Sequence, residues 1–324
     1  MSDNSSADVT PVSSTSIPED RPRVAGHWLF FGAHGLRAGW SVLIFATLCM
    51  ILIIVGGFAV GPFLHLRRGM AISPFTGFLL EMSQLIPVMA ATAIMAAIER
   101  RSLFYYGFQG RARLLRLVSG FVWGFIAISA VVFLLRRLGY LSLDGETISG
   151  ITALRYGLSW AAMFIGVGFC EEAMVRGYAQ FTMTRGIGFW WGAFLLCLPF
   201  AFMHGSNPGE SPVGLVGVGA ASLIFCLSLW YTGSLWWAVG FHAAWDWGQS
   251  YFYGTADSGL IAQGHLFSEH PVGPAVWSGG ATGPEGSVLV LPLLLVIALL
   301  MAAWWGKRGE QPFKGSAWHP GRLP

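Results

Sequence analysis

The chain has 324 residues, of which 54% are hydrophobic and only 11% are charged. Soluble proteins carry about 25% charged residues, so the composition excludes a soluble fold of this length. The net charge of +3 offers no basic surface for nucleic acid, and no nucleic-acid partner is predicted. The composition predicts a multi-pass membrane protein in contact with the lipid bilayer.

Residues 1–24 are rich in Ser, Asp, Pro and Thr and contain no apolar core, so we expect a disordered N-terminal tail. Because this tail lacks the apolar region of a signal peptide, the first spanning helix is expected to serve as an uncleaved insertion signal. A transmembrane helical domain is expected over 25–306, followed by a C-terminal tail over 307–324.

The hydropathy pattern predicts an all-α bundle of about eight transmembrane helices. These spans cover 40–60, 75–98, 115–135, 156–184, 188–204, 213–230, 234–252 and 287–305, and the long fourth span is expected to protrude over 176–185. The distribution of Lys and Arg among the loops predicts that both termini are cytoplasmic. The four cysteines lie in apolar stretches, where they are typical of small hydrophobic residues rather than of disulfides.

One long loop, 253–286, separates the last two spans. It is rich in glycine, contains Asp257, Glu269 and Glu285, and has no Lys or Arg. The positive-inside rule therefore places this loop outside the cytoplasm. A loop of this length without a regular pattern is usually functional or mobile.

Charged and titratable side chains are rare within the predicted spans. A charge at the bilayer centre costs at least ~3 kcal/mol, so a cluster of such residues indicates function. The residues concerned are Glu81, Glu171, Glu172, Arg176, His204, His242 and Asp246. Because most of them lie in the fourth, fifth and seventh spans, we expect a polar cavity among these three helices. Glu81 and Gln84 in the second span fit cavity lining and helix packing equally well.

The fourth span carries the densest group of charges. Glu172 and Arg176 are four residues apart, so they share one helix face and can form an ion pair. Glu171 lies about 100° around the helix and has no such partner, which assigns it to chemistry and the pair to structural support. The alternative is that both carboxylates share the guanidinium as a packing clamp.

Helical geometry predicts which of these groups can meet. If the fourth and fifth spans turn near 186–188, Glu171 and His204 each lie ~25 Å along their helices from the turn. His242 and Asp246 are four residues apart, so the carboxylate could orient the imidazole. Counted from the start of its span, however, His242 lies only ~13 Å along its helix, shallower than Glu171.

These groups allow two kinds of chemistry. Glu171 and His204 could deprotonate water, while His242 held by Asp246 stabilises the oxyanion, which predicts hydrolysis of a peptide bond within the membrane. Alternatively, Glu171, His204 and His242 could bind a divalent metal such as zinc, although an H-E-x-x-H signature is absent. The sequence does not choose between them, and no other cofactor is predicted.

Three motifs together resemble the CPBP family, the CAAX-protease and bacteriocin-processing membrane endopeptidases, also called Abi proteins. They are Glu171-Glu172 with Arg176, Phe200 with His204, and His242 with Asp246. The resemblance covers the third span onwards and implies a catalytic core at about 115–286. It implies that Glu171 and His204 activate water, that His242 and Asp246 form the oxyanion site, and that Glu172 and Arg176 support the first motif. Members are often labelled metalloproteases, and a metal-free glutamate mechanism has also been proposed for the fold.

The resulting prediction is an intramembrane endopeptidase of a bacterial cytoplasmic membrane that acts on a membrane-associated protein or peptide. Two alternatives remain open. One is a non-enzymatic immunity or scaffold protein that keeps the motifs as a folding core. The other is a proton-coupled transporter with Glu171 and Glu81 as a relay. Neither the substrate nor the oligomeric state follows from the sequence.

Overall fold

The structure is a computed structural model that describes residues 27–32, 35–64, 71–110, 112–308 and 312–313. The predicted tail 1–24 and most of the predicted tail 307–324 lie outside the described residues. The chain divides into two units, Met1–Arg37 and Ala38–Pro324. In the first unit, helix α1 (His27–Phe30) precedes two short antiparallel strands, β1 (Phe31–Gly32) and β2 (Gly35–Leu36).

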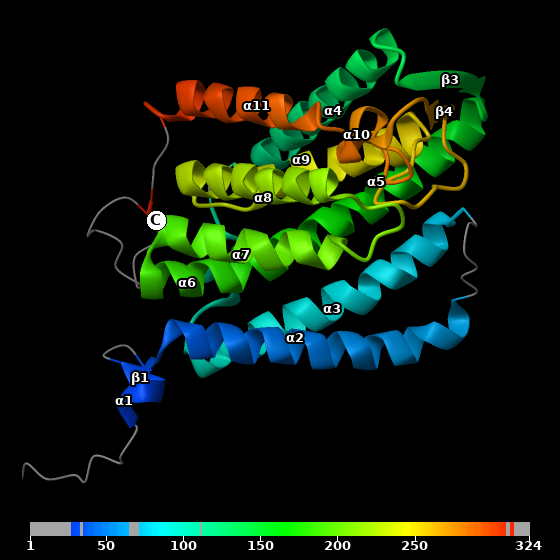
Figure 1. The fold of residues 1–324 in the computed structure, drawn as a ribbon. Helices are drawn as coiled ribbons and strands as arrows, with labels where there is room; N and C mark the ends of the chain where they lie inside the picture. The colour runs from blue at the N-terminus through cyan, green and yellow to red at the C-terminus, as the bar shows by residue number, and fades with distance from the viewer. Residues whose placement is uncertain (1–26, 33–34, 65–70, 111, 309–311, 314–324) are drawn as a thin grey trace, which may run out of the picture. The chain divides into compact units, whose positions relative to one another are not determined.

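The second unit is a helical bundle in which α2 packs on α3, α6 on α7, and α8 on both α7 and α11 (Figure 1). Its helices are α2 (Ala38–Val60), α3 (Pro74–Ile98), α4 (Arg113–Arg137), α5 (Gly150–Glu172), α6 (Gln180–Ile187), α7 (Phe189–His204), α8 (Pro212–Thr232), α9 (Trp236–Trp247), α10 (Ala275–Ser278) and α11 (Val290–Trp305). Each predicted span lies mostly on helical residues, so the predicted helical fold class is confirmed. Among the described residues, 5 helical segments are long and apolar enough to cross a membrane, and α7 and α11 are shorter apolar helices. The count of eight spans stays a prediction.

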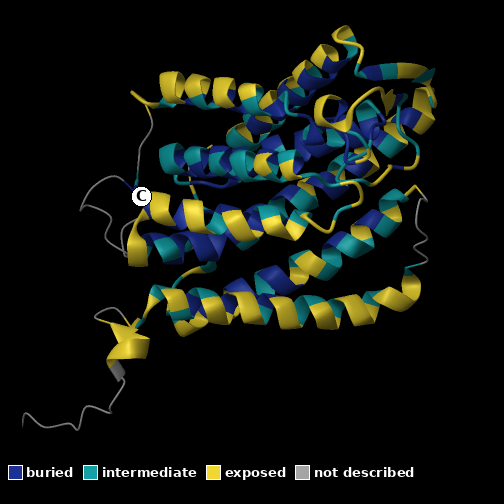
Figure 2. Cartoon of the chain, in the orientation of Figure 1, coloured by how far each residue is buried: buried dark blue, intermediate teal, exposed yellow. Residues whose placement is uncertain are grey.

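Large apolar side chains cover the outside of the bundle. Phe58, Trp191 and Phe202 expose 79%, 69% and 81% of their surface. Figure 2 shows exposed residues running along α2, α7 and α11. Extensive apolar exposure of this kind is unfavourable in water and is typical of a surface that lipid covers.

Helix α9 packs closely between α4 and α5 because glycines let the backbones approach. A Cβ atom at Gly120 of α4 would collide with the carbonyl of Trp237, and one at Gly124 with that of Phe241. The spacing of these two glycines is the small-xxx-small pattern of close membrane helix pairs. On the other side of α9, Gly168 of α5 leaves no room for a larger side chain. The histidine-bearing part of α9 is thereby held against α5.

The long fourth span consists of three consecutive helical segments. Helix α5 ends at Glu172, a π-helical segment continues over Ala173–Ala179, and α6 begins at Gln180. Within the π-helical segment, Gly177 departs from helical geometry with a ψ of -117°. Segments of this kind are frequent at functional sites. Here the wider turn begins directly after the paired glutamates.

The long loop is more ordered than its sequence predicts. Strand β4 (Phe267–Pro271) pairs with β3 (Leu141–Glu146), and a short 3₁₀ turn forms at Pro284–Gly286. An isolated parallel bridge joins Ile72, just before α3, to Ala262. The prediction of a loop without regular structure is therefore wrong. Short polar strands gain their hydrogen bonds from partners far away in sequence, which no local pattern reveals.

A second polar group ties the end of α3 to α6. Both terminal nitrogens of Arg185 donate to the carboxylate of Glu99 at 3.0 Å. The hydroxyl groups of Tyr178 and Tyr106 donate to the same carboxylate at 2.7 and 3.3 Å. These four residues, which we name the Glu99 cluster, leave neither oxygen of Glu99 without a donor.

Candidate active site

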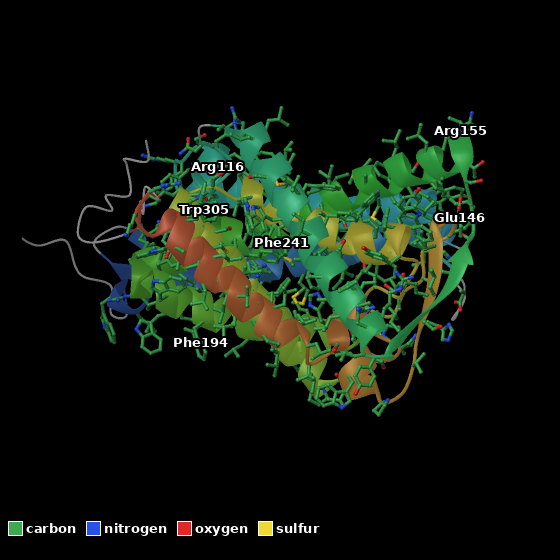
Figure 3. All side chains as sticks on the ribbon, turned by 90° about the horizontal axis from the view of Figure 1, so that it is seen from above. Arg116, Glu146, Arg155, Phe194, Phe241 and Trp305 are labelled. Atoms are coloured by element: carbon green, nitrogen blue, oxygen red, sulfur yellow. The ribbon has the colours of Figure 1, made fainter. Side chains whose placement is uncertain are left out.

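A pocket of about 410 Å³ lies among α3, α5, α7, α8, α9, α11 and the long loop. Its polar lining residues are Glu81, Gln84, Glu171, His204, Asn207, His242, Asp246, Ser250, Asp257, Ser258 and Glu285. The structure thus brings the four residues predicted to be catalytic to one pocket, and it places Glu81 and Gln84 there as cavity lining. Figure 3 shows Phe241 of α9 in the interior of the bundle, whereas Arg155 and Phe194 lie at its edge.

The carboxylate of Glu171 lies beside the imidazole of His242. Nε2 of His242 is 3.7 Å from Oε2 of Glu171 and 3.7 Å from Oδ2 of Asp246. The expected mismatch in depth between Glu171 and His242 is therefore absent. That expectation assumed untilted helices that begin at one depth, and the contact shows this assumption to be wrong. The side chain of Glu171 keeps 27% of its surface exposed, so it remains accessible from the pocket.

Glu172 holds the other nitrogen of His242. Its Oε1 accepts a hydrogen bond from Nδ1 at 3.3 Å, and the imidazole stacks on the ring of Phe225. The sequence predicts that Asp246 orients this ring. Asp246 lies beside Nε2, but 3.7 Å is too long for a hydrogen bond, and the hydrogen bond to the ring comes from Glu172. Because a carboxylate can only accept, the proton lies on Nδ1.

The predicted ion pair between Glu172 and Arg176 is present. Nη1 of Arg176 lies 3.2 Å from Oε1 of Glu172, and both side chains are fully buried. Arg176 therefore lies in the interior and not at a protruding helix end as expected. Its guanidinium also lies 4.5 Å from the centre of the Phe200 ring, a cation–π contact. The arginine thus connects the first motif to the second.

His204 reaches the pocket from the end of α7. Its Nδ1 lies 2.8 Å from the carbonyl oxygen of Phe200, which can only accept a hydrogen bond. This bond places the proton on Nδ1 and leaves Nε2 of a neutral imidazole free to accept. No direct hydrogen bond or ion pair joins His204 to Glu171, although both of these described side chains line the pocket.

The residues considered as metal ligands do not form a ligand cluster. In the described part of the chain, no group of three or more His, Cys, Asp or Glu side chains is arranged to hold a metal ion. Glu171 and His242 are in contact, but His204 does not complete a set with them.

Two acids of the long loop also line the pocket, and the sequence did not identify them as site residues. Asp257 accepts hydrogen bonds from Gln249 at 2.6 Å and from Ser250 at 2.7 Å. Burial and the nearby carboxylate of Glu285 raise the pKa of Asp257, and burial raises that of Glu285. A sequence signal for these acids is the lack of Lys and Arg in this loop, which leaves them without local partners.

Comparison with protein families supports the motif assignment. Residues 153–248 match the family model described as type II CAAX prenyl endopeptidase Rce1-like. This segment includes all three motifs and runs from α5 to the end of α9. No curated protein matches the chain. Residues 153–248 are therefore Rce1-like, which confirms the predicted resemblance of this part of the chain to the CPBP family.

Proposed function

We propose that the protein is an intramembrane endopeptidase that hydrolyses a peptide bond of a membrane-associated protein or peptide. The observation that carries this proposal is the contact between Glu171 and His242 within a pocket that His204 also lines. A half-buried carboxylate beside an imidazole, with a second imidazole facing the same space, is a suitable arrangement for general acid–base catalysis.

In the proposed reaction, Glu171 and His204 remove a proton from a water molecule in the pocket. The free Nε2 of His204 suits this role because its Nδ1 is occupied by the Phe200 carbonyl. The water oxygen bonds to the carbonyl carbon of the substrate. As the C–N bond breaks, Glu171 or His204 returns the proton to the departing amine.

His242 is assigned to the oxyanion. In its doubly protonated form, Nδ1–H donates to Glu172, and Nε2–H is left to donate to the oxygen that becomes negative. Asp246 lies on the same side as Nε2 and supports this form of the ring. Donors of this kind contribute about 3 kcal/mol to lowering the barrier.

The Glu172–Arg176 pair serves as structural support. Arg176 neutralises Glu172, and the same Oε1 that contacts Arg176 also accepts the bond from His242, which holds the ring in place. Burial of an unpaired charge would be strongly unfavourable, so the pair maintains the geometry rather than reacting. A multi-pass location in a bacterial cytoplasmic membrane, with cytoplasmic termini, belongs to this proposal.

Comparative membrane proteomics of cells that express wild type or Glu171→Gln tests the proposal. We expect uncut precursors to accumulate in the variant, while the variant protein is produced at the wild-type level. Glu146→Gln is the matched control, because Glu146 is exposed outside the pocket. Identical peptide profiles in wild type and Glu171→Gln would contradict proteolysis and favour a non-enzymatic scaffold.

A further inference from the structure

The charged residues that line the pocket are mainly acidic. Among the described residues that line it are five carboxylic acids and no Lys or Arg. The acids are Glu81, Glu171, Asp246, Asp257 and Glu285. Only the two imidazoles of His204 and His242 can supply positive charge. Five acids against two imidazoles exceed what water activation requires.

The loop acids are held in place by built contacts. Besides the two donors to Asp257, Glu285 accepts the backbone N–H of Ser258 at 2.7 Å and its hydroxyl at 3.2 Å. The backbone N–H of Gly259 in turn bonds to Thr282, which closes the loop beside Glu285. Neutral donors orient these carboxylates without neutralising them.

A third acid in the pocket has one oxygen without a hydrogen-bond partner among the described residues. Glu81 of α3 exposes only 6% of its surface, and its Oε1 forms no hydrogen bond with any described residue. A buried carboxylate oxygen without a donor is energetically unfavourable, so it indicates that a bound group supplies the hydrogen bond. Glu81 belongs to a different element from the loop acids, so it is an independent sign that the pocket lacks a donor-rich group.

The remaining walls of the pocket suit a long cationic side chain. Trp160, Phe164, Phe225 and Trp245 line it with aromatic surface. Aromatic faces attract ammonium and guanidinium groups, and apolar walls accommodate the methylene stem of Lys or Arg. The combination of aromatic walls and acids without a Lys or Arg in the described lining favours a cationic side chain over acidic and neutral ones.

We propose that the pocket recognises a lysine or arginine side chain of the substrate, held by Asp257 and Glu285 beside the catalytic groups. This substrate class rests on the proposed function. Asp257 and Glu285 then determine specificity and do not carry out the reaction. The incoming cation supplies the donors and the positive charge that the pocket lacks.

Binding of designed peptides to Glu171→Gln tests this assignment without requiring cleavage. The probe is an acetylated and amidated Leu/Ala peptide of roughly 20 residues, long enough to span a bilayer, with one central lysine. A second peptide carries norleucine at that position, which keeps the stem and removes the charge. Affinities are measured for the full chain in lipid nanodiscs. Because the termini are blocked, the side chain is the only source of charge.

We expect the lysine peptide to bind roughly tenfold or more tightly than the norleucine peptide, the range of a hydrogen bond to a charged group. Adding Asp257→Asn and Glu285→Gln should abolish this ratio, with the melting temperature showing that the protein remains folded. The control Asp144→Asn, an exposed acid on β3, should keep the ratio. Equal affinities for both peptides, or no binding of either, would overturn the specificity assignment.

Cleavage of the same peptides by wild type is scored separately. A lysine preference in binding without any cleavage would contradict the endopeptidase while leaving the cation site in place. Cleavage of both peptides at equal rates would support the endopeptidase and overturn the cation site. The two failures are therefore distinguishable.

Discussion

The Glu99 cluster and the pocket both bury carboxylates, but they differ in the hydrogen-bond donors around these groups and in the direction in which the pKa is shifted. Glu99 receives two bonds from Arg185 and one each from Tyr178 and Tyr106. Burial opposes its ionisation, yet the bonds from Arg185 and Tyr178 and the nearby Arg101 lower the pKa of Glu99 overall. In the pocket, by contrast, burial raises the pKa of Asp257, and no described Lys or Arg lines the walls.

The difference separates structural from reactive carboxylates. A carboxylate saturated with charged donors is fixed in one ionisation state and one geometry, so it stabilises the fold. A buried carboxylate with spare acceptor capacity can exchange protons or bind a cation. Glu172 lies between the two classes, since Arg176 and His242 share its Oε1 while Oε2 has no hydrogen-bond partner among the described residues.

The largest effect is expected on the cleavage rate, when a proposed acid–base group of the pocket is removed. His204→Gln should lower cleavage by roughly 10²- to 10⁴-fold, the usual contribution of a general acid–base group. The melting temperature should stay near that of wild type, because among the described residues the His204 side chain forms a hydrogen bond only within its own helix. Rates are measured on a precursor identified by proteomics. His270→Gln, at an exposed histidine on β4, is the control, and equal loss in both variants would refute a catalytic role.

Removing the cation from the structural pair should mainly affect stability. Arg176→Ala leaves Glu172 as a fully buried charge with no guanidinium, so we expect a loss of roughly 3–5 kcal/mol. Thermal unfolding in detergent measures it. Arg155→Ala removes an exposed arginine of α5 and should be nearly neutral. An Arg176→Ala protein as stable as wild type would remove the structural assignment.

The Glu99 cluster should respond in stability but not in chemistry. Glu99→Gln weakens the bidentate contact with Arg185, and we expect a loss of about 2 kcal/mol. The cleavage rate per folded molecule should not change, because none of the cluster lines the pocket. If Glu99→Gln lowered the cleavage rate while the protein kept its full stability, the distinction between a structural cluster and a reactive pocket would be contradicted.

The last prediction concerns pH. Burial raises the pKa of Glu269 on β4 to about 7, although Arg136 lies 3.6 Å away. The folded state then holds this proton more tightly than the unfolded chain, in which the pKa is about 4.3. Its contribution to stability is complete below pH ~4 and is lost as pH rises through about 7. We expect Glu269→Gln to flatten the melting-temperature profile between these values, whereas an unchanged profile would contradict the assignment.

Much of the fold could be predicted because lipid restricts a membrane-spanning segment to few backbone conformations. Long apolar runs become helices, since the backbone must satisfy its hydrogen bonds internally. The pairing of β3 with β4 could not be predicted in this way, because it depends on contacts between distant polar segments. The same limit applies to Glu99 and Arg185, which only the packing of α3 against neighbouring helices brings together.

The site was predictable to the extent that its chemistry follows helical spacing. Glu172 and Arg176 pair as their four-residue separation predicts. The hydrogen bond from His242 to Glu172 crosses from α9 to α5, and only the close packing at Gly168 allows it. Asp257 and Glu285 lie in a glycine-rich loop without periodicity, so sequence could report their charge but not their position.

The role of Glu171 is tested most directly by cleavage in water labelled with ¹⁸O, using purified wild type and Glu171→Gln in lipid nanodiscs. The substrate is a precursor that accumulates in the variant cells. We expect wild type to incorporate the label into the new carboxyl terminus, and Glu171→Gln to give no product at an unchanged melting temperature. Equal label incorporation by both proteins would contradict water activation by Glu171.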